Sequence, residues 1–208
     1  GSFSVKHGKA IILLAVLITI PAFYSYATTA PNYNLLGSAS GNLESISASN
    51  ALTDSFGGGR LMPTYVVVTF SQPIVDGNGS FNMGEMQTLQ SISSTISNHE
   101  GIQEVTGPTM PFREPVDYQT ITNVSDSTTY NALLNAIGED NQSALITVKF
   151  TFDPYSTEAI ECASDIRNSL HTNYDGIANV TGVYLGGATG GMLDTKITFE
   201  SEFNAILP

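Results

Sequence analysis

Residues 101–107 read GIQEVTG, and residues 176–182 read GIANVTG. The two heptapeptides share Gly, Ile, Val, Thr and Gly at the same spacing. Each follows a stretch with apolar residues every three or four positions, which is the pattern of an amphipathic helix. Each of those stretches follows a β-prone run that ends in Thr-Phe, at 69–70 and at 151–152. The repetition therefore predicts two strand–helix–strand units in tandem.

Local patterns give the expected bounds of these units. The expected strands are Thr64–Phe70, Gly101–Gly107, Ala144–Phe152 and Gly176–Leu185, and the expected helices are Asn82–His99, Thr128–Ile137 and Thr157–His171. Two tandem units make the β-α-β-β-α-β order of ferredoxin-like α+β folds. The run Val66-Val67-Val68 favours burial of its strand on both faces. We expect two helices on one sheet face and a neighbouring domain on the other.

Residues 10–27, AIILLAVLITIPAFYSYA, contain no charged residue. As a helix they would span roughly 27 Å, close to the hydrocarbon thickness of a bilayer. Lys6 and Lys9 precede the segment, and no Lys or Arg follows until Arg60. This asymmetry predicts a transmembrane helix with a cytoplasmic N-terminus, so that the residues after Ala27 are extracytoplasmic.

Two other interpretations of this segment stay open. A buried helix of a soluble protein rarely reaches this length without a polar face. A cleaved signal peptide has its parts here: the basic Lys6 and Lys9, the apolar residues 11–20, and Ser25-Tyr26-Ala27 as a small-x-small cleavage site. Both the membrane helix and the signal peptide place the rest of the chain outside the cytoplasm.

Composition excludes some partners for the part after Ala27. It carries five basic and nineteen acidic residues, a net charge of −14. Nucleic acid is excluded as a partner, because phosphate contacts require clustered Lys and Arg. Cys162 is the single cysteine, so no intrachain disulfide forms, and we expect it to pack as a small core residue. Asn-x-Ser/Thr sequences at Asn78, Asn123, Asn141 and Asn179 give only weak support for outside exposure, since the chain is rich in these residues.

The residues that could carry chemistry form no catalytic or metal-binding pattern. His7, His99 and His171 are isolated in the sequence. Glu158, Glu161 and Asp165 fit a solvated helix face better than paired catalytic acids. The glycine run 186–191 lacks the G-x-G-x-x-G spacing and the Lys of a phosphate-binding loop, and it favours a close crossing of backbones. We therefore expect no enzyme activity, no cofactor and no metal.

Several short motifs occur in an order that resembles a known family. They are Tyr33-Asn34-Leu35-Leu36, a short helix from Leu43 to Phe56 that Gly57 ends, the strand from Pro63 to Val68, Val183-Tyr184-Leu185-Gly186-Gly187-Ala188 with Asp194 beyond it, and a helix reaching Pro208. With the preceding membrane helix, this order resembles the MMPL branch of the resistance–nodulation–division (RND) transporters. The resemblance implies a transmembrane helix at 10–27, a linker and short helix at 28–63, a porter domain at 64–186, and at 187–208 a helix toward the second membrane helix.

The same resemblance implies the function. Such proteins are proton-driven exporters of lipids or other hydrophobic compounds, and their proton-carrying Asp and Tyr lie on later membrane helices, outside this chain. Gly186, Gly187, Ala188 and Asp194 are expected to shape the connection between porter domain and membrane. The expected partners are the bilayer, a hydrophobic substrate, the remaining membrane helices and a second porter domain, and a homo-oligomer stays open. The alternative is a single-pass or secreted cell-surface binding domain without a transport role.

Overall fold

The computed structural model describes residues 7–28, 43–57, 59, 62–121, 127–177 and 179–206. The chain divides into two units, residues 1–32 and 33–208, and each is considered by itself. The first unit contains the helix α2 (Gly8–Thr28), which includes Pro21. Its exposed apolar side chains include Leu13 and Phe23, each 68% exposed. The helix is long and apolar enough to cross a membrane.

The second unit is a mixed α+β fold built on a four-stranded antiparallel sheet. Its elements are α3 (Glu44–Phe56), β1 (Thr64–Phe70), α5 (Met83–Ser97), β2 (Ile102–Thr106), α6 (Ser127–Leu134), β3 (Ser143–Phe150), α7 (Thr157–Tyr174), β4 (Val180–Gly186) and α8 (Gly187–Ile206). The strand order is β2-β3-β1-β4, so the two strands that contain the repeated motif form the two edges. In the middle of the sheet, Val67 of β1 lies opposite Leu145 of β3 and Tyr184 of β4.

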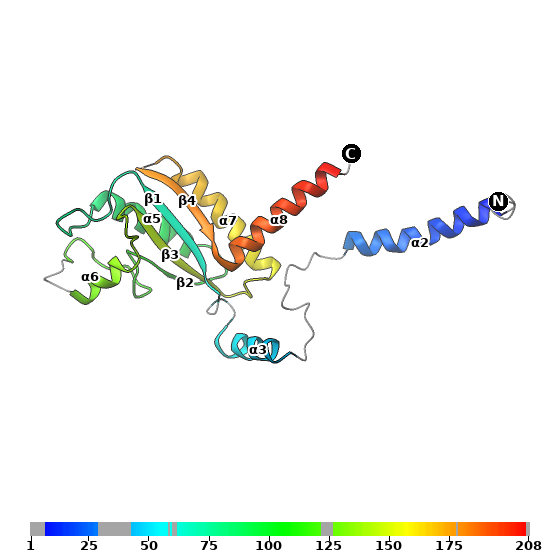
Figure 1. Ribbon diagram of the computed structural model, residues 1–208, viewed down its shortest axis with the longest axis horizontal. Helices are drawn as coiled ribbons and strands as arrows, with labels where there is room; N and C mark the ends of the chain where they lie inside the picture. Colours follow the sequence, from blue (N-terminus) through cyan, green and yellow to red (C-terminus); the bar gives the residue numbers. More distant parts are fainter. Residues whose placement is uncertain are drawn as a thin grey trace. The chain divides into compact units, whose positions relative to one another are not determined.

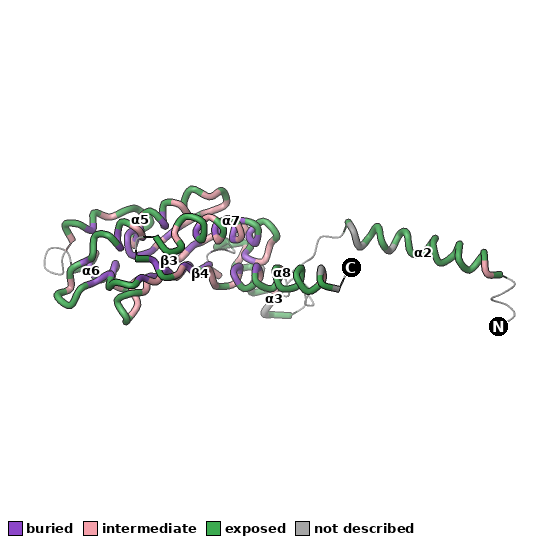
Figure 2. Tube along the Cα trace, turned by 90° about the horizontal axis from the view of Figure 1, so that it is seen from above, coloured by how far each residue is buried: buried purple, intermediate pink, exposed green. Residues whose placement is uncertain are grey.

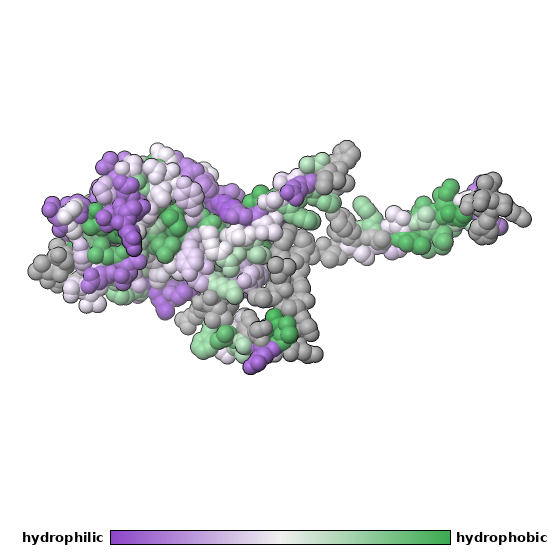
Figure 3. Space-filling view, in the orientation of Figure 1, coloured by the Kyte–Doolittle hydropathy of each residue, from purple (hydrophilic) through white to green (hydrophobic). Residues whose placement is uncertain are grey.

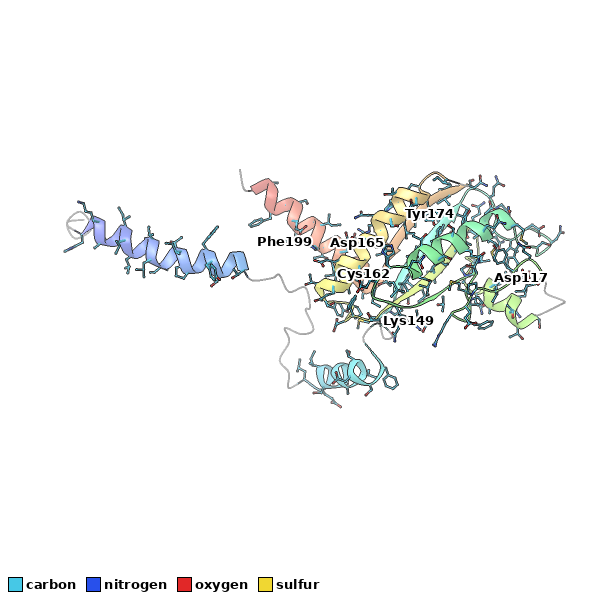
Figure 4. The ribbon with its side chains drawn as sticks, turned by 180° about the vertical axis from the view of Figure 1, so that it is seen from behind. Asp117, Lys149, Cys162, Asp165, Tyr174 and Phe199 are labelled. Carbon is cyan, nitrogen blue, oxygen red and sulfur yellow. The ribbon has the colours of Figure 1, made fainter. Side chains whose placement is uncertain are left out.

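Helices α5 and α7 lie on one face of this sheet (Figures 1 and 4). The core is between the two layers, where Figure 2 shows the buried residues. Alternate residues of β1 and β3 point into it, and they meet one apolar side of each helix. Fully buried side chains include Val66, Val68, Ile146 and Val148 from the strands, Leu89, Ile92 and Ile96 from α5, and Ile160, Ala163 and Ile166 from α7.

The helix starts follow from capping residues. The Asn82 side chain accepts a hydrogen bond from the Gly84 N–H at the start of α5, and Ser156 Oγ accepts one from the Ala159 N–H at the start of α7. The side-chain oxygens thus satisfy amides that the first helical turn leaves free. The predicted N-cap at Asn82 is confirmed, and β1 has the predicted bounds.

Several details of the predicted elements are wrong. α7 ends at Tyr174, three residues after the predicted end at His171. Burial of β1 on both faces is wrong, because Tyr65 is 37% exposed on the face opposite to the helices. β4 begins at Val180 rather than Gly176, since Gly176 and Asn179 have φ of 71° and 66°, which extended strands do not accommodate. α6 ends at Leu134, three residues early, and Ile137 instead forms a bridge with Ala144. β3 ends at Phe150, where the predicted strand runs to Phe152.

Candidate functional site

The junction of β4 and α8 contains the glycines that the sequence singled out. Gly187 has φ of 88°, and a Cβ at this position would lie 2.7 Å from the Pro63 carbonyl oxygen. At Gly190 a Cβ would lie 3.1 Å from the Leu185 carbonyl oxygen. By contrast, a Cβ on Gly186 would meet nothing within 4 Å. The predicted close crossing of backbones is therefore confirmed at Gly187, whereas Gly190 approaches the end of its own preceding strand. The helix begins inside the glycine run.

Asp194 lies on α8 two turns after Ala188, which is half-buried. One Asp194 carboxylate oxygen is 2.7 Å from Nη1 of Arg167 on α7. The second guanidinium nitrogen of Arg167 donates to the Leu185 carbonyl at 3.5 Å. Asp194 is 63% exposed, so the ion pair contributes at most about 1 kcal/mol. Arg167 thus connects α7 with the end of β4 and with the first half of α8.

The second half of α8 extends from the domain (Figure 1). Leu193 is 2% exposed, whereas Ile197 and Phe199 are 48% and 61% exposed. The Phe199 and Phe203 rings stack with their centroids 6.3 Å apart, and Figure 4 shows Phe199 on the extending part. This half of the helix therefore presents apolar side chains that the described part of the domain does not cover.

We name the sheet face opposite to α5 and α7 the open face; its central residues are Tyr65, Val67, Leu145 and Tyr184. Tyr65, Leu145 and Tyr184 are 37%, 38% and 59% exposed. These residues adjoin through the strand register, since Leu145 and Tyr184 flank Val67 on its two sides. Figure 3 looks at this face and shows apolar surface over the sheet between polar margins. The open face thus combines an apolar centre with two tyrosine hydroxyls.

An ion-pair cluster lies where β2 and β3 border the open face. Glu104, whose side chain is 8% exposed, accepts a hydrogen bond from Lys149 Nζ at 2.7 Å. Arg113 Nε lies 3.1 Å from the other carboxylate oxygen. Lys149 is marked in Figure 4. The cluster thus pairs a nearly buried carboxylate with two cations. It also fixes the loop that contains Arg113 against β2. Arg113 itself has a positive φ of 73°.

A shallow recess of about 290 Å³ adjoins the open face near the end of α6. Its lining includes Thr106, Pro111, Ala136, Leu145 and Thr147. Asn135 also lines the recess, and polar and apolar atoms contribute to its surface about equally, so it suits a small group that is partly polar.

The other residues considered from the sequence are dispersed. Across the described ranges, no three His, Cys, Asp or Glu side chains gather where they could hold a metal. His171 Nδ1 lies 2.7 Å from Asp175 Oδ2, one turn along the same helix. Glu158, Glu161 and Asp165 are exposed on α7, which confirms the solvated face.

The Cys162 side chain is buried, which confirms its predicted place in the core. Its Sγ–H donates to the Glu100 carbonyl at 3.3 Å, and this bond connects α7 with the segment before β2. Burial, and secondarily the negative charge of Asp165, raises the pKa of this thiol to about 11. The thiol therefore stays protonated near neutral pH and serves packing rather than nucleophilic chemistry.

The sequence interpretation missed one buried carboxylate. Glu85 in the first turn of α5 is 2% exposed, and its Oε1 accepts a hydrogen bond from Asn179 Nδ2 at 3.1 Å. Its Oε2 has no hydrogen-bond partner among the described residues. The spacing Asn82-x-x-Glu85 matches a capping box, but the Asn82 N–H donates to the Ile74 carbonyl instead, so the sequence carried no signal for the contact between Glu85 and Asn179.

No protein-family model matches the chain, and no curated protein matches it significantly. The functional argument therefore depends on the chain's own residues.

Proposed function

We propose that the second unit is the first extracytoplasmic porter domain of a proton-driven RND/MMPL-type membrane transporter, which exports lipids or other hydrophobic compounds. The main support is the open face. Leu145 and Tyr184 are exposed to water. If a partner buried them, each side chain would contribute roughly 1.5–3 kcal/mol to the free energy of association. A self-contained binding domain has less reason to leave the centre of its sheet uncovered.

The fold class of this proposal is the ferredoxin-like arrangement. The order β2-β3-β1-β4 and the positions of α5 after β1 and of α7 after β3 support it. In such an arrangement the two helices cover one face, so the opposite face is available for contacts. A second porter domain would cover the open face, and the recess beside it would hold part of a hydrophobic substrate.

Two helices would connect this domain to the membrane. The helix α2 would be the first of a larger membrane bundle, with the residues after Ala27 outside the cytoplasm. The extending half of α8, with Ile197 and Phe199 exposed, would lead to the next membrane helix. Gly187 and Asp194 would fix the direction in which α8 leaves the domain. The protons would move through membrane helices beyond this chain, so none of its residues is proposed to be catalytic, and the protein is proposed not to be an enzyme.

Binding of a hydrophobic fluorescent dye to the chain tests the role of the open face. We expect saturable binding that Leu145→Ser weakens about tenfold, the equivalent of about 1.4 kcal/mol. Ile177→Ser is the matched control, because Ile177 is 52% exposed and lies outside the open face. Absence of saturable binding, or equal effects of both substitutions, would contradict direct substrate contact.

Extraction from membranes tests the anchor separately. The chain should stay in the membrane fraction after alkaline carbonate treatment, and deletion of residues 8–28 should release it. A chain that carbonate releases without the deletion would favour the secreted alternative.

A further inference from the structure

Four Asn-x-Ser/Thr sequences occur in the chain, and the proposed transport function uses none of them. Three of them, at Asn78, Asn141 and Asn179, lie in the described part, while Asn123 lies outside it. Attachment of a glycan requires a free side-chain amide nitrogen and an accessible hydroxyl two residues later. The three sequences differ in both respects.

The Asn179 sequence has both groups engaged. Its Nδ2, the atom that would bear a glycan, donates to the buried carboxylate of Glu85 at 3.1 Å. The hydroxyl of Thr181 donates to Thr69 Oγ1 at 2.9 Å across the sheet. Modification in the folded protein would have to break both bonds and leave Glu85 buried without its partner, which is costly.

The Asn141 sequence has its hydroxyl engaged. Ser143 Oγ donates to Asp140 Oδ2 at 2.6 Å, and Ser143 already belongs to β3. The Asn141 carbonyl accepts the Ile74 N–H at 2.6 Å, so the backbone of this turn is fixed as well. Modification in the folded protein would therefore have to break the hydrogen bond of the Ser143 hydroxyl.

The Asn78 sequence differs in its side chains, although hydrogen bonds fix the backbone of its turn as well. Asn78 and Ser80 are exposed in the turn between β1 and α5. The backbone amides of Asn78 and Ser80 donate to Asp76 Oδ1 at 2.9 and 2.8 Å, and the Asp76 amide donates to the Ser80 carbonyl at 2.9 Å. Within the described residues, no hydrogen bond engages the Asn78 amide or the Ser80 hydroxyl. Tyr130 donates to the Gly79 carbonyl at 2.7 Å, which holds the turn at the surface.

We propose that Asn78 is an N-glycosylation site that is used selectively after the domain has folded. The Asn78 Nδ2 would attack C1 of a sugar carried on a lipid-linked phosphate. The C1–N bond forms, the C1–O bond to phosphate breaks, the amide loses one proton to a base, and the lipid phosphate leaves. The proposal depends on the proposed extracytoplasmic position of the domain, because sugar transfer to such sequences occurs there.

Peptide mass spectrometry of the full chain tests the site, with the protein produced in cells that glycosylate Asn-x-Ser/Thr sequences outside the cytoplasm. We expect a glycan mass on the Asn78 peptide and unmodified Asn141 and Asn179 peptides. Asn78→Gln and Ser80→Ala should abolish the modification. Ser80→Thr should retain it, because threonine also supplies the hydroxyl.

Protease added to intact cells separates the two proposals. If the protease digests the domain and the Asn78 peptide carries no glycan, the site is wrong while the proposed position outside the cytoplasm stands. If the protease cannot reach the domain, the proposed position fails and the site fails with it. Glycans on all three described sequences would contradict selection by the folded structure.

Discussion

The two strand–helix–strand halves, residues 64–107 and 143–186, contain the same motif but differ in the structure that follows it. In both copies the first glycine has a positive φ, 87° at Gly101 and 71° at Gly176. In both, the shared valine is buried to the same degree, with Val105 and Val180 each 4% exposed. The motif therefore specifies a left-handed residue before an edge strand and one buried valine on that strand.

The halves diverge after the motif. Gly107, the last motif residue of the first copy, pairs with Met110 in a tight turn, and β2 ends before it. In the second copy the strand extends past Gly182 to Gly186, and α8 follows without a loop. The comparison shows that the residues after the motif, and not the motif, determine the length of the strand.

Removal of one core leucine from each half should have the largest effect. Leu89 of α5 and Leu170 of α7 are 0% and 1% exposed. We expect Leu89→Ala and Leu170→Ala each to lower the free energy of unfolding by about 2–5 kcal/mol, because each leaves a cavity. Denaturant unfolding measures this, with the exposed Gln87→Ala as control. Two separate transitions in either variant would indicate that the halves do not share one core.

Substitution at the junction of β4 and α8, which follows the second half, should cause the next largest loss of stability. Gly187→Ala should lower stability by about 2–4 kcal/mol, because it combines a positive φ with a clash against the Pro63 carbonyl. Gly186→Ala should change stability by less than about 0.5 kcal/mol, since its Cβ meets nothing within 4 Å. Thermal unfolding of both variants measures the difference. Similar losses would contradict a specific crossing at Gly187.

Substitution of the first glycine of each motif by alanine should cause smaller losses of stability, and the two losses should differ. Gly101→Ala should cost about 2 kcal/mol and Gly176→Ala about 1 kcal/mol. Both positions have a positive φ, but a Cβ on Gly101 would also clash with the Phe152 ring, whereas one on Gly176 meets nothing within 4 Å. Chemical denaturation of each variant checks this order. A larger loss of stability at Gly176 than at Gly101 would contradict the close contact between Gly101 and the Phe152 ring.

The smallest effect concerns pH, because α7 carries a buried thiol. Burial raises its folded pKa to about 11, above the ordinary thiol value of 9.0, so the folded state retains the proton to higher pH than the unfolded state. The contribution of Cys162 is therefore complete below pH 9 and is lost as the pH rises toward 11. The difference in stability between the chain and Cys162→Ala should therefore change between pH 9 and 11, as the chain loses this contribution and the variant does not. Unfolding curves of both proteins measure this difference, and a difference that stays constant would contradict the raised pKa.

Sequence periodicity was sufficient to predict which residues form the core. It was insufficient to predict where a strand begins and which of its outer residues are exposed. The three- and four-residue spacing of Leu89, Ile92 and Ile96 predicted the buried side of α5 because burial on a helix is periodic. The start of β4 could not be predicted in this way, since it depends on the left-handed Asn179, whose side chain is bonded to Glu85 far away in sequence. The exposure of Tyr65 depends likewise on what covers the sheet.

The glycine run shows the same limit at the site. Its lack of a phosphate-binding pattern predicted a close backbone crossing, and that part is confirmed. The partner of the crossing, Pro63, could not be named because it depends on tertiary structure. The Arg167 contact to Asp194 is equally non-local and carries no sequence signal.

The first half of α8 is fixed to the domain through Leu193 and the Arg167–Asp194 ion pair, so it moves together with the sheet. The half beyond Asp194, residues 195–206, extends about 18 Å further. A rotation of the domain by about 10° would displace the end of this half by about 3 Å relative to Asp194. Because no loop separates β4 from α8, a twist of the sheet would be transmitted to the end of the helix.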